Sequence, residues 1–339
     1  MFLLHPAILS VVPVLYLYSS NWGQVPFSDA LTPMALSLCV AMALVAALRL
    51  VLKDWRASAL LVSTMLILFF TYGRLVNSLG GSRAVRLALA LAYLAVLALA
   101  AWLAVKNRGG LEKPTVIMNV VAGALLVMTM AGMVTNGLKR EPPATTWKGE
   151  VARLAASGTV SKPPAERLPD IYYVILDGYG SERVLSRYYD YDNGEFVRAL
   201  EGRGFRVTRD SRSNYMQTRL SLASSLNLEH ITFLSRDVGE NSRRAGAPNT
   251  MIEDNGLAEF LKSRGYGFAF FGTNWSGTKS NKNADVSVTD GGWLDGEFMT
   301  ALIETTALRR MIGERGLYTR EGVLRAFSLI PRIRERMKG

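Results

Sequence analysis

Five apolar stretches fill most of the first 138 residues, and short polar turns separate them. A transmembrane helix needs roughly 20 predominantly apolar residues, because each residue adds about 1.5 Å toward a hydrocarbon layer roughly 30 Å thick. We therefore predict a transmembrane domain over residues 1–138. Its predicted spans are residues 2–18, 31–52, 57–76, 87–105 and 115–138. No Lys or Arg precedes the first stretch and no small-residue cleavage site follows it, so we expect it to be retained rather than removed as a signal peptide.

The Lys and Arg residues of the short turns predict the orientation of this domain, because basic residues in short loops stay on the cytoplasmic side. If the N-terminus is cytoplasmic, the turns on that side carry Lys53, Arg56, Lys106, Arg108 and Lys113. Of the outer turns, residues 20–29 carry no basic residue and residues 77–86 carry Arg83 and Arg86. An odd number of spans then places everything after Leu138 outside, which predicts a multi-pass protein with an extracytoplasmic soluble domain.

The chain changes character after Leu138. Residues 1–138 include nine Lys or Arg and three Asp or Glu, whereas residues 139–339 include 30 Lys or Arg and 25 Asp or Glu. We predict a linker over residues 139–168, which are polar and contain four prolines, with a helical piece at 146–156. Residues 169–339 then form the soluble domain.

This soluble domain alternates between strand and helix patterns. Residues 171–176 are an unbroken apolar run rich in β-branched and aromatic residues, which predicts a strand buried on both faces. Further strands are predicted at 205–207 and 266–271, and helices at 193–203, 256–263, 298–312 and 321–337. The alternation favours an open α/β sheet with helices on its faces.

Asp177 follows the first predicted strand directly, on a turn with Gly178. Ligands of open α/β sheets bind where the carboxyl ends of strands meet, and a carboxylate held there can coordinate a hard divalent cation. The alternative is that Asp177 caps the next helix or accepts hydrogen bonds within its own turn.

Thr218 precedes a helix of small residues that begins at about Leu220. The N–H groups and the positive dipole end of such a helix favour an anion, and a metal held by Asp177 would activate the Thr218 hydroxyl as a nucleophile. Arg219 would then neutralise the oxygens of the attacked phosphoryl or sulfuryl group. The alternative is that Thr218 is an ordinary N-cap and that the serines of the helix only allow close packing.

In combination, these features resemble the sulfatase-like branch of the alkaline phosphatase superfamily. The resemblance is carried by a buried strand that ends in Asp-Gly-Tyr at residues 177–179, followed about forty residues later by Thr218 at the head of a small-residue helix. Five spans before an outside domain further resemble the lipoteichoic acid synthases and phosphoethanolamine transferases of bacterial envelopes. Asn227, nine residues after Thr218, matches an Asn of the synthases. The resemblance covers the chain loosely and residues 169–290 more closely.

The resemblance implies site residues, a cofactor and a location. Thr218 would be the nucleophile and, with Asp177, a metal ligand. The substrate would lie beside Gly178, Tyr179 and Asn214. The implied cofactor is a divalent metal, Mn, Mg, Ca or Zn, and the implied partners are membrane lipid and a lipid-linked or glycan substrate at a bacterial inner or plasma membrane. The implied fold is an alkaline phosphatase-like sheet, of which this chain would hold an incomplete version.

The pattern departs from that family in its second half. The family completes its site with an Asp-His pair and usually a further His, but this chain contains only His5 and His230 and no Asp-His dipeptide. The segment after Pro169 is also shorter than a family catalytic domain. We therefore expect the N-terminal part of a longer enzyme or a variant that has lost catalysis, with its metal weakly held or absent and a second polypeptide as one way to complete the site. We expect a surface or capping role for His230.

Two functions follow from these observations. The first is a membrane-anchored hydrolase or transferase that acts on phosphate or sulfate esters of envelope lipids or glycans. The second is a non-catalytic envelope protein, derived from that family, that binds or assembles. A nucleic-acid partner is not expected, because no basic cluster lies along one face. A transporter is disfavoured, because apart from Arg74 the spans hold almost no ionisable residue.

Overall fold

The computed structural model describes residues 4–138, 168–240, 242, 245–273, 275–289, 296–310 and 320–338. Residues 139–167, which contain nearly all of the predicted linker and the helical piece expected at 146–156, lie outside the described residues.

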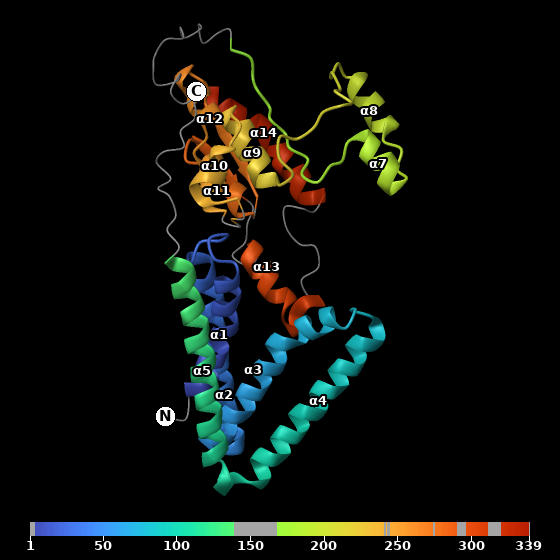
Figure 1. Ribbon diagram of the computed structural model, residues 1–339. Helices are drawn as coiled ribbons and strands as arrows, with labels where there is room; N and C mark the ends of the chain where they lie inside the picture. The colour runs from blue at the N-terminus through green and yellow to red at the C-terminus, as the bar shows by residue number, and fades with distance from the viewer. Residues whose placement is uncertain are drawn as a thin grey trace.

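Five apolar helices form a bundle that runs up and down between two ends (Figure 1). They are α1 (Leu4–Ser20), α2 (Ser28–Leu52), α3 (Trp55–Ser78), α4 (Arg83–Lys106) and α5 (Glu112–Gly137). Four of them, α2 to α5, are long and apolar enough to cross a membrane. The first is apolar but has 17 residues, which gives a length of about 25 Å. The predicted positions of the apolar helices are therefore confirmed, and four of the five meet the length of a span.

The shortest helix lies at the centre of the bundle. α1 packs against α2, α3 and α5, whereas α4 packs chiefly against α3. Polar contacts also tie α1 to its neighbours, since the buried His5 ring nitrogen Nδ1 lies 2.6 Å from Ser63 Oγ of α3 and the His5 backbone N–H donates to Asn119 Oδ1 of α5 at 3.0 Å. The apolar outer surface of the bundle is thus formed mainly by the other helices.

One helix of the second half enters this bundle. α13 (Glu297–Glu304) buries Phe298, Met299, Leu302 and Ile303 in the same apolar core as α1, α2 and α3. The turn after it, which leads into the 3₁₀ helix η5 (Ala307–Arg310), accepts a hydrogen bond from the Gly73 backbone N–H to Thr305 O, 3.0 Å. The helix predicted at 298–312 therefore ends at Glu304, and its apolar face packs on the bundle.

Two further contacts join the soluble segment to the bundle at the same end. The Ala245 backbone N–H donates to Gly23 O at 3.0 Å, and Lys279 Nζ lies 3.4 Å from Asp29 Oδ1. The soluble segment consequently sits at the end of the bundle opposite to the turns that carry Lys53 and Lys106 (Figure 1).

The soluble segment is mostly helical (Figure 1). Its remaining helices are α7 (Glu182–Tyr189), α8 (Gly194–Glu201), α9 (Thr218–Asn227), α10 (Phe233–Val238), α11 (Gly246–Glu253), α12 (Gly256–Ser263) and α14 (Arg320–Lys338). The predicted helices at 193–203, 256–263 and 321–337 correspond to α8, α12 and α14 and are confirmed within two residues at their ends.

The described residues hold one sheet of two parallel strands, β1 (Ala269–Gly272) and β2 (Val286–Thr289), with Ala269 opposite Val286. Asp285, the residue before β2, fixes this pairing. Lys262 Nζ donates to its Oδ1 at 2.7 Å, and the Phe268 N–H donates to its Oδ2 at 2.8 Å. The bond from Lys262, and then that from Phe268, hold the pKa of the Asp285 carboxyl below its usual range. The strand predicted at 266–271 is therefore present but begins at Ala269.

The prediction of a buried strand at residues 171–176 is wrong. The six side chains are between 46% and 61% exposed, and the segment is extended without pairing to either strand. Residues 205–207 likewise form no strand. An apolar, β-branched run favours burial only where a second layer and a neighbouring strand exist to receive it, and the described part of the chain provides neither at this position. The alkaline phosphatase-like sheet stays an expectation.

Candidate functional site

Asp177 stands on a tight turn at the end of the extended segment. The Tyr179 N–H donates to Leu176 O at 3.2 Å, and Gly178 has a φ of 72°. This is the pattern of a type II turn, which favours Gly at its third position. Tyr179 anchors the turn to α8, because its hydroxyl donates to Asn193 Oδ1 at 2.5 Å and its ring packs edge-on against Phe196.

Thr218 lies at the other side of the site, as the first residue of α9. The cap position is occupied by Gln217, whose side chain makes no capping bond, so the alternative of Thr218 as the N-cap is wrong. The first turn is bonded from the Ser221 N–H to Gln217 O at 2.9 Å, which leaves the N–H groups of residues 218–220 without a helical acceptor. The N-terminus of α9 therefore presents donors where an anion was predicted.

The structure brings Asp177 and Thr218 together across 41 positions of sequence. The Thr218 hydroxyl donates to Asp177 Oδ1 at 3.2 Å. Asp177 is exposed and Thr218 is half-buried. Both side chains are thus open to a ligand and lie close enough to share one.

Arg219 is adjacent but held on another partner. Its guanidinium lies over the ring of Trp275, 5.4 Å from the ring centroid, a distance at which a cation is attracted to an aromatic face. Trp275 follows β1 by three residues. The ends of β1 and of the 171–176 segment therefore both approach the first turn of α9.

Two other predicted residues contribute to the packing of α9. Asn214 donates from Nδ2 to Ser224 Oγ at 3.0 Å, and Ser224 in turn donates to Glu229 O. Asn227 is 2% exposed, and its Nδ2 donates to Ala223 O and Met251 O. Its Oδ1 accepts from the Gly256 N–H. These contacts link α9 to α11 and α12, so both asparagines hold the scaffold of the site.

The carboxylate oxygen of Asp177 and the hydroxyl oxygen of Thr218 fit a hard divalent cation in chemical type and in spacing. Two oxygens 3.2 Å apart can be neighbouring ligands of an ion bound at about 2.0 to 2.5 Å. Their number is small, since no group of three or more His, Cys, Asp or Glu side chains converges within the described residues. His230 is exposed with its ring against Tyr215, in agreement with the predicted surface role, and His5 lies in the bundle.

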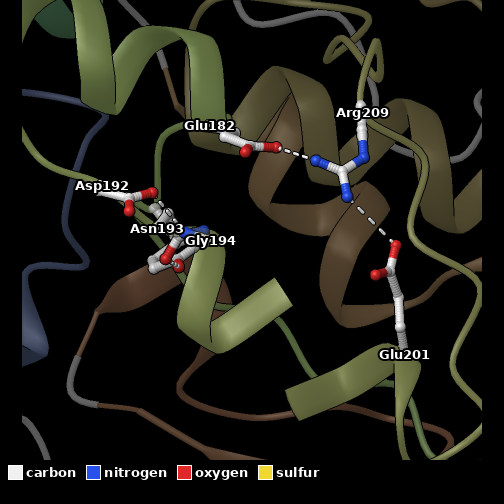
Figure 2. A network of polar contacts seen from close by, with 7 residues as sticks. Glu182, Asp192, Asn193, Gly194, Glu201 and Arg209 are labelled. Carbon is white, nitrogen blue, oxygen red and sulfur yellow. Dashed lines mark hydrogen bonds and ion pairs between the residues drawn. The ribbon is translucent and has the colours of Figure 1, made fainter. Parts of the chain in front are cut away.

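An ionic network beside the turn was not foreseen from the sequence. Figure 2 shows Arg209 between Glu182 and Glu201, with nitrogen–oxygen distances of 2.6 Å and 3.3 Å. A cavity of about 460 Å³ adjoins it and reaches Asn193, the partner of Tyr179. Arg209 neutralises carboxylates that would otherwise be metal-ligand candidates, and it braces α7 against α8.

Comparisons of the chain with models of known protein families, with curated proteins and with solved structures found no match. The contact between Asp177 and Thr218 is therefore the observation from which a function can be proposed.

Proposed function

We propose that the chain is a membrane-anchored, sulfatase-like protein whose site transfers or hydrolyses phosphate or sulfate esters of envelope lipids or glycans. The hydrogen bond of 3.2 Å between Thr218 and Asp177 supports this proposal. It joins a hydroxyl, a carboxylate and the unbonded N–H groups of a helix N-terminus at one point, which is the combination needed to attack and hold a tetrahedral anion.

In this proposal the Thr218 oxygen attacks phosphorus or sulfur and its proton passes to Asp177, to which the hydroxyl is already bonded. The ester bond breaks, and the alcohol of the substrate leaves with a proton. Water or a glycan hydroxyl then attacks the same phosphorus or sulfur and frees the Thr218 oxygen, which regains a proton. The N–H groups of the first turn of α9 bind the oxygens of the transferred group. Arg219 moves from the Trp275 ring to those oxygens when substrate binds. A divalent cation held by Asp177 and Thr218 would supply a lowered hydroxyl pKa and charge neutralisation. A second polypeptide would supply further ligands for it.

The alternative function is non-catalytic binding or assembly in the envelope. It is favoured by the exposed apolar side chains of residues 171–176. Their backbone pairs with no strand among the described residues and is suited to accept a strand from a partner. In this case Asp177 and Thr218 would shape the end of the binding segment and perform no chemistry.

Replacing Thr218 with alanine is expected to lower turnover by about a thousandfold or more, because a nucleophile has no substitute. Turnover would be measured on the full chain with nitrophenyl phosphate and nitrophenyl sulfate in Mn²⁺ or Mg²⁺. Thr208→Ala, which changes an exposed threonine, is the matched control and should retain activity. Undiminished turnover in Thr218→Ala would exclude Thr218 as the nucleophile.

A titration with Mn²⁺ tests the site without relying on turnover. Wild-type protein should bind Mn²⁺ more tightly than Asp177→Asn, because the amide removes a charged oxygen ligand. Equal binding by the two proteins, together with no turnover in the wild type, would favour the non-catalytic function.

We also propose that α1 crosses the membrane with the four longer helices, that the N-terminus is cytoplasmic, and that the soluble segment lies outside a bacterial plasma membrane. The basic residues of the two turns at the far end of the bundle support this orientation. A single cysteine placed at Ser280 in a Cys39→Ser background should react with a membrane-impermeant maleimide in intact cells, whereas one placed at Asn107 should not. The reverse pattern would invert the topology.

A further inference from the structure

Four arginines belong to the elements that meet where the α3–α4 hairpin turns, at the end of the bundle that carries the soluble segment (Figure 1). Arg74 lies in the last turns of α3, Arg83 and Arg86 begin α4, and Arg309 belongs to η5. We refer to Arg74, Arg83, Arg86 and Arg309 as the arginine cluster. Two of its members are the basic residues that the orientation rule did not expect in an outer turn.

The structure adds Arg309 to this turn from more than 220 residues away in the sequence. The Arg309 guanidinium donates to Asn77 Oδ1, one turn of α3 beyond Arg74. The adjacent bond from the Gly73 N–H to Thr305 O fixes η5 against the same helix. The position of Arg309 is thus set by two contacts with α3.

No carboxylate neutralises the cluster within the described residues. The sequence contains no Asp or Glu between Asp54 and Glu112, and none of the four arginines forms an ion pair in the part of the chain that the structure describes. Arg86 donates to Gly81 O, and Arg74 lies 5.0 Å from the ring centroid of Tyr16. Each guanidinium has five N–H donors, so these single contacts leave donors for a ligand.

Its surroundings favour a position of the cluster near a membrane interface. The α3–α4 turn is lower in Figure 1 than the upper ends of α1 and α5, and α13 buries its apolar face in the core beside it. Tyr72 and Tyr93 pack edge-on below the turn, and the Tyr72 hydroxyl donates to Arg86 O at 3.1 Å. Tyrosines of this kind mark the level of lipid head groups, where unneutralised arginines favour an anionic partner.

An apolar stripe continues from the cluster along α4. Leu87, Leu91 and Leu94 are 59% to 63% exposed, and their spacing places them on the helix face below Arg83. A molecule that places a phosphate at the arginines and a hydrocarbon chain along this stripe would satisfy both. Arginine binds phosphate through paired N–H donors, which gives such contacts geometric specificity.

We propose that the arginine cluster binds the phosphate group of an anionic phospholipid, with an acyl chain lying along Leu87, Leu91 and Leu94. This site is separate from Asp177 and Thr218 and does not depend on their chemistry. The proposal also gives Arg83 and Arg86 a reason to lie in a turn on the side of the soluble segment.

The test compares lipid binding by the full chain in detergent micelles, counted by native mass spectrometry during titration with phosphatidylglycerol. The variant Arg83→Gln, Arg86→Gln, Arg309→Gln should raise the apparent Kd at least about tenfold. The control changes three basic residues at the opposite end, Arg56→Gln, Lys106→Gln and Lys113→Gln, and should leave the Kd within about twofold. The single variant Arg83→Gln should also raise the Kd. The Arg83 side chain makes no hydrogen bond or ion pair within the part of the chain that the structure describes, so its loss should not disturb folding.

Three results would overturn the proposal. Equal weakening by both triple variants would indicate diffuse attraction of charge rather than a site. Equal affinity of wild-type protein for phosphatidylcholine, whose phosphate is balanced by its own choline, would remove the role of net negative charge. Displacement of the lipid by free glycerol phosphate at a comparable concentration would identify a soluble phosphate compound as the ligand. Asp177→Asn should leave lipid binding unchanged, which separates this result from that of the proposed catalytic site.

Discussion

Replacing Gly73 with alanine is expected to release α13 from the membrane bundle. A Cβ at this position would lie 2.1 Å from Glu304 O and 2.6 Å from the carbonyl carbon of Thr305, and both atoms belong to the backbone. A backbone neighbour cannot rotate away as a side chain can, so η5 and the end of α13 must move. The expected loss of unfolding free energy is about 3 kcal/mol or more, since overpacking alone costs about 1 to 3 kcal/mol and the apolar face of α13 loses burial as well.

Thermal unfolding of the purified chain would measure the loss of stability. Limited proteolysis of the soluble segment would measure the release of α13. Gly123→Ala is the matched control, because a Cβ there meets no atom within 4 Å. It should leave the unfolding temperature unchanged or raise it slightly, since alanine favours a helix over glycine. A Gly73→Ala protein as stable and as protease-resistant as Gly123→Ala would contradict the close packing of α3 against residues 304–305.

Replacing Asn227 with alanine is expected to disrupt the packing of α9 against α11 and α12 and to destabilise the soluble segment. The side chain is almost fully buried and makes three hydrogen bonds, with Ala223 O, Met251 O and the Gly256 N–H, at 2.7 to 2.9 Å. Its removal leaves buried backbone groups of two other helices unsatisfied, each costing about 1 to 3 kcal/mol. The expected destabilisation is about 3 to 5 kcal/mol.

Asn214→Ala is the comparison for this experiment, because Asn214 is exposed and makes one bond to Ser224. It should cost less than about 1 kcal/mol. Asn227→Asp keeps the acceptor for the Gly256 N–H but loses both donors, so its stability should fall between those of wild type and Asn227→Ala. Urea unfolding monitored by tryptophan fluorescence gives the order. A stable Asn227→Ala protein that has lost only turnover would instead favour a catalytic role for this residue.

The elements that could be predicted from the sequence are those decided by neighbours along the chain. A run of about 20 apolar residues is sufficient to predict a membrane helix, which is why α2 to α5 were found. α12 is also decided by its neighbours along the chain, since Asn255 caps it through a bond to the Ala258 N–H and Gly265 follows it. The position of Thr218 at the start of α9 depended on the change from a polar loop to a small-residue helix, which is also local.

The features that escaped prediction depend on residues far apart. The 171–176 segment has the composition of a buried strand, but burial is decided by whether other strands pair with it. The apolar residues of α13 indicate a buried face without indicating that α1 and α2 cover it. Arg309 reaches the α3–α4 turn only because Gly73 allows the chain to approach, and no pattern within either segment contains that information.

The central position of α1 has a consequence for how the protein is made. α1 leaves the ribosome before α2, α3 and α5, which later enclose it, and the partners of His5 are Ser63 and Asn119. Until the last of these helices is inserted, the polar groups of His5 face lipid or water without their native acceptors and donors. Chains released before residue 119 is synthesised are therefore expected to remain substrates for membrane quality-control proteases, and completion of α5 is the step that makes the bundle resistant to them.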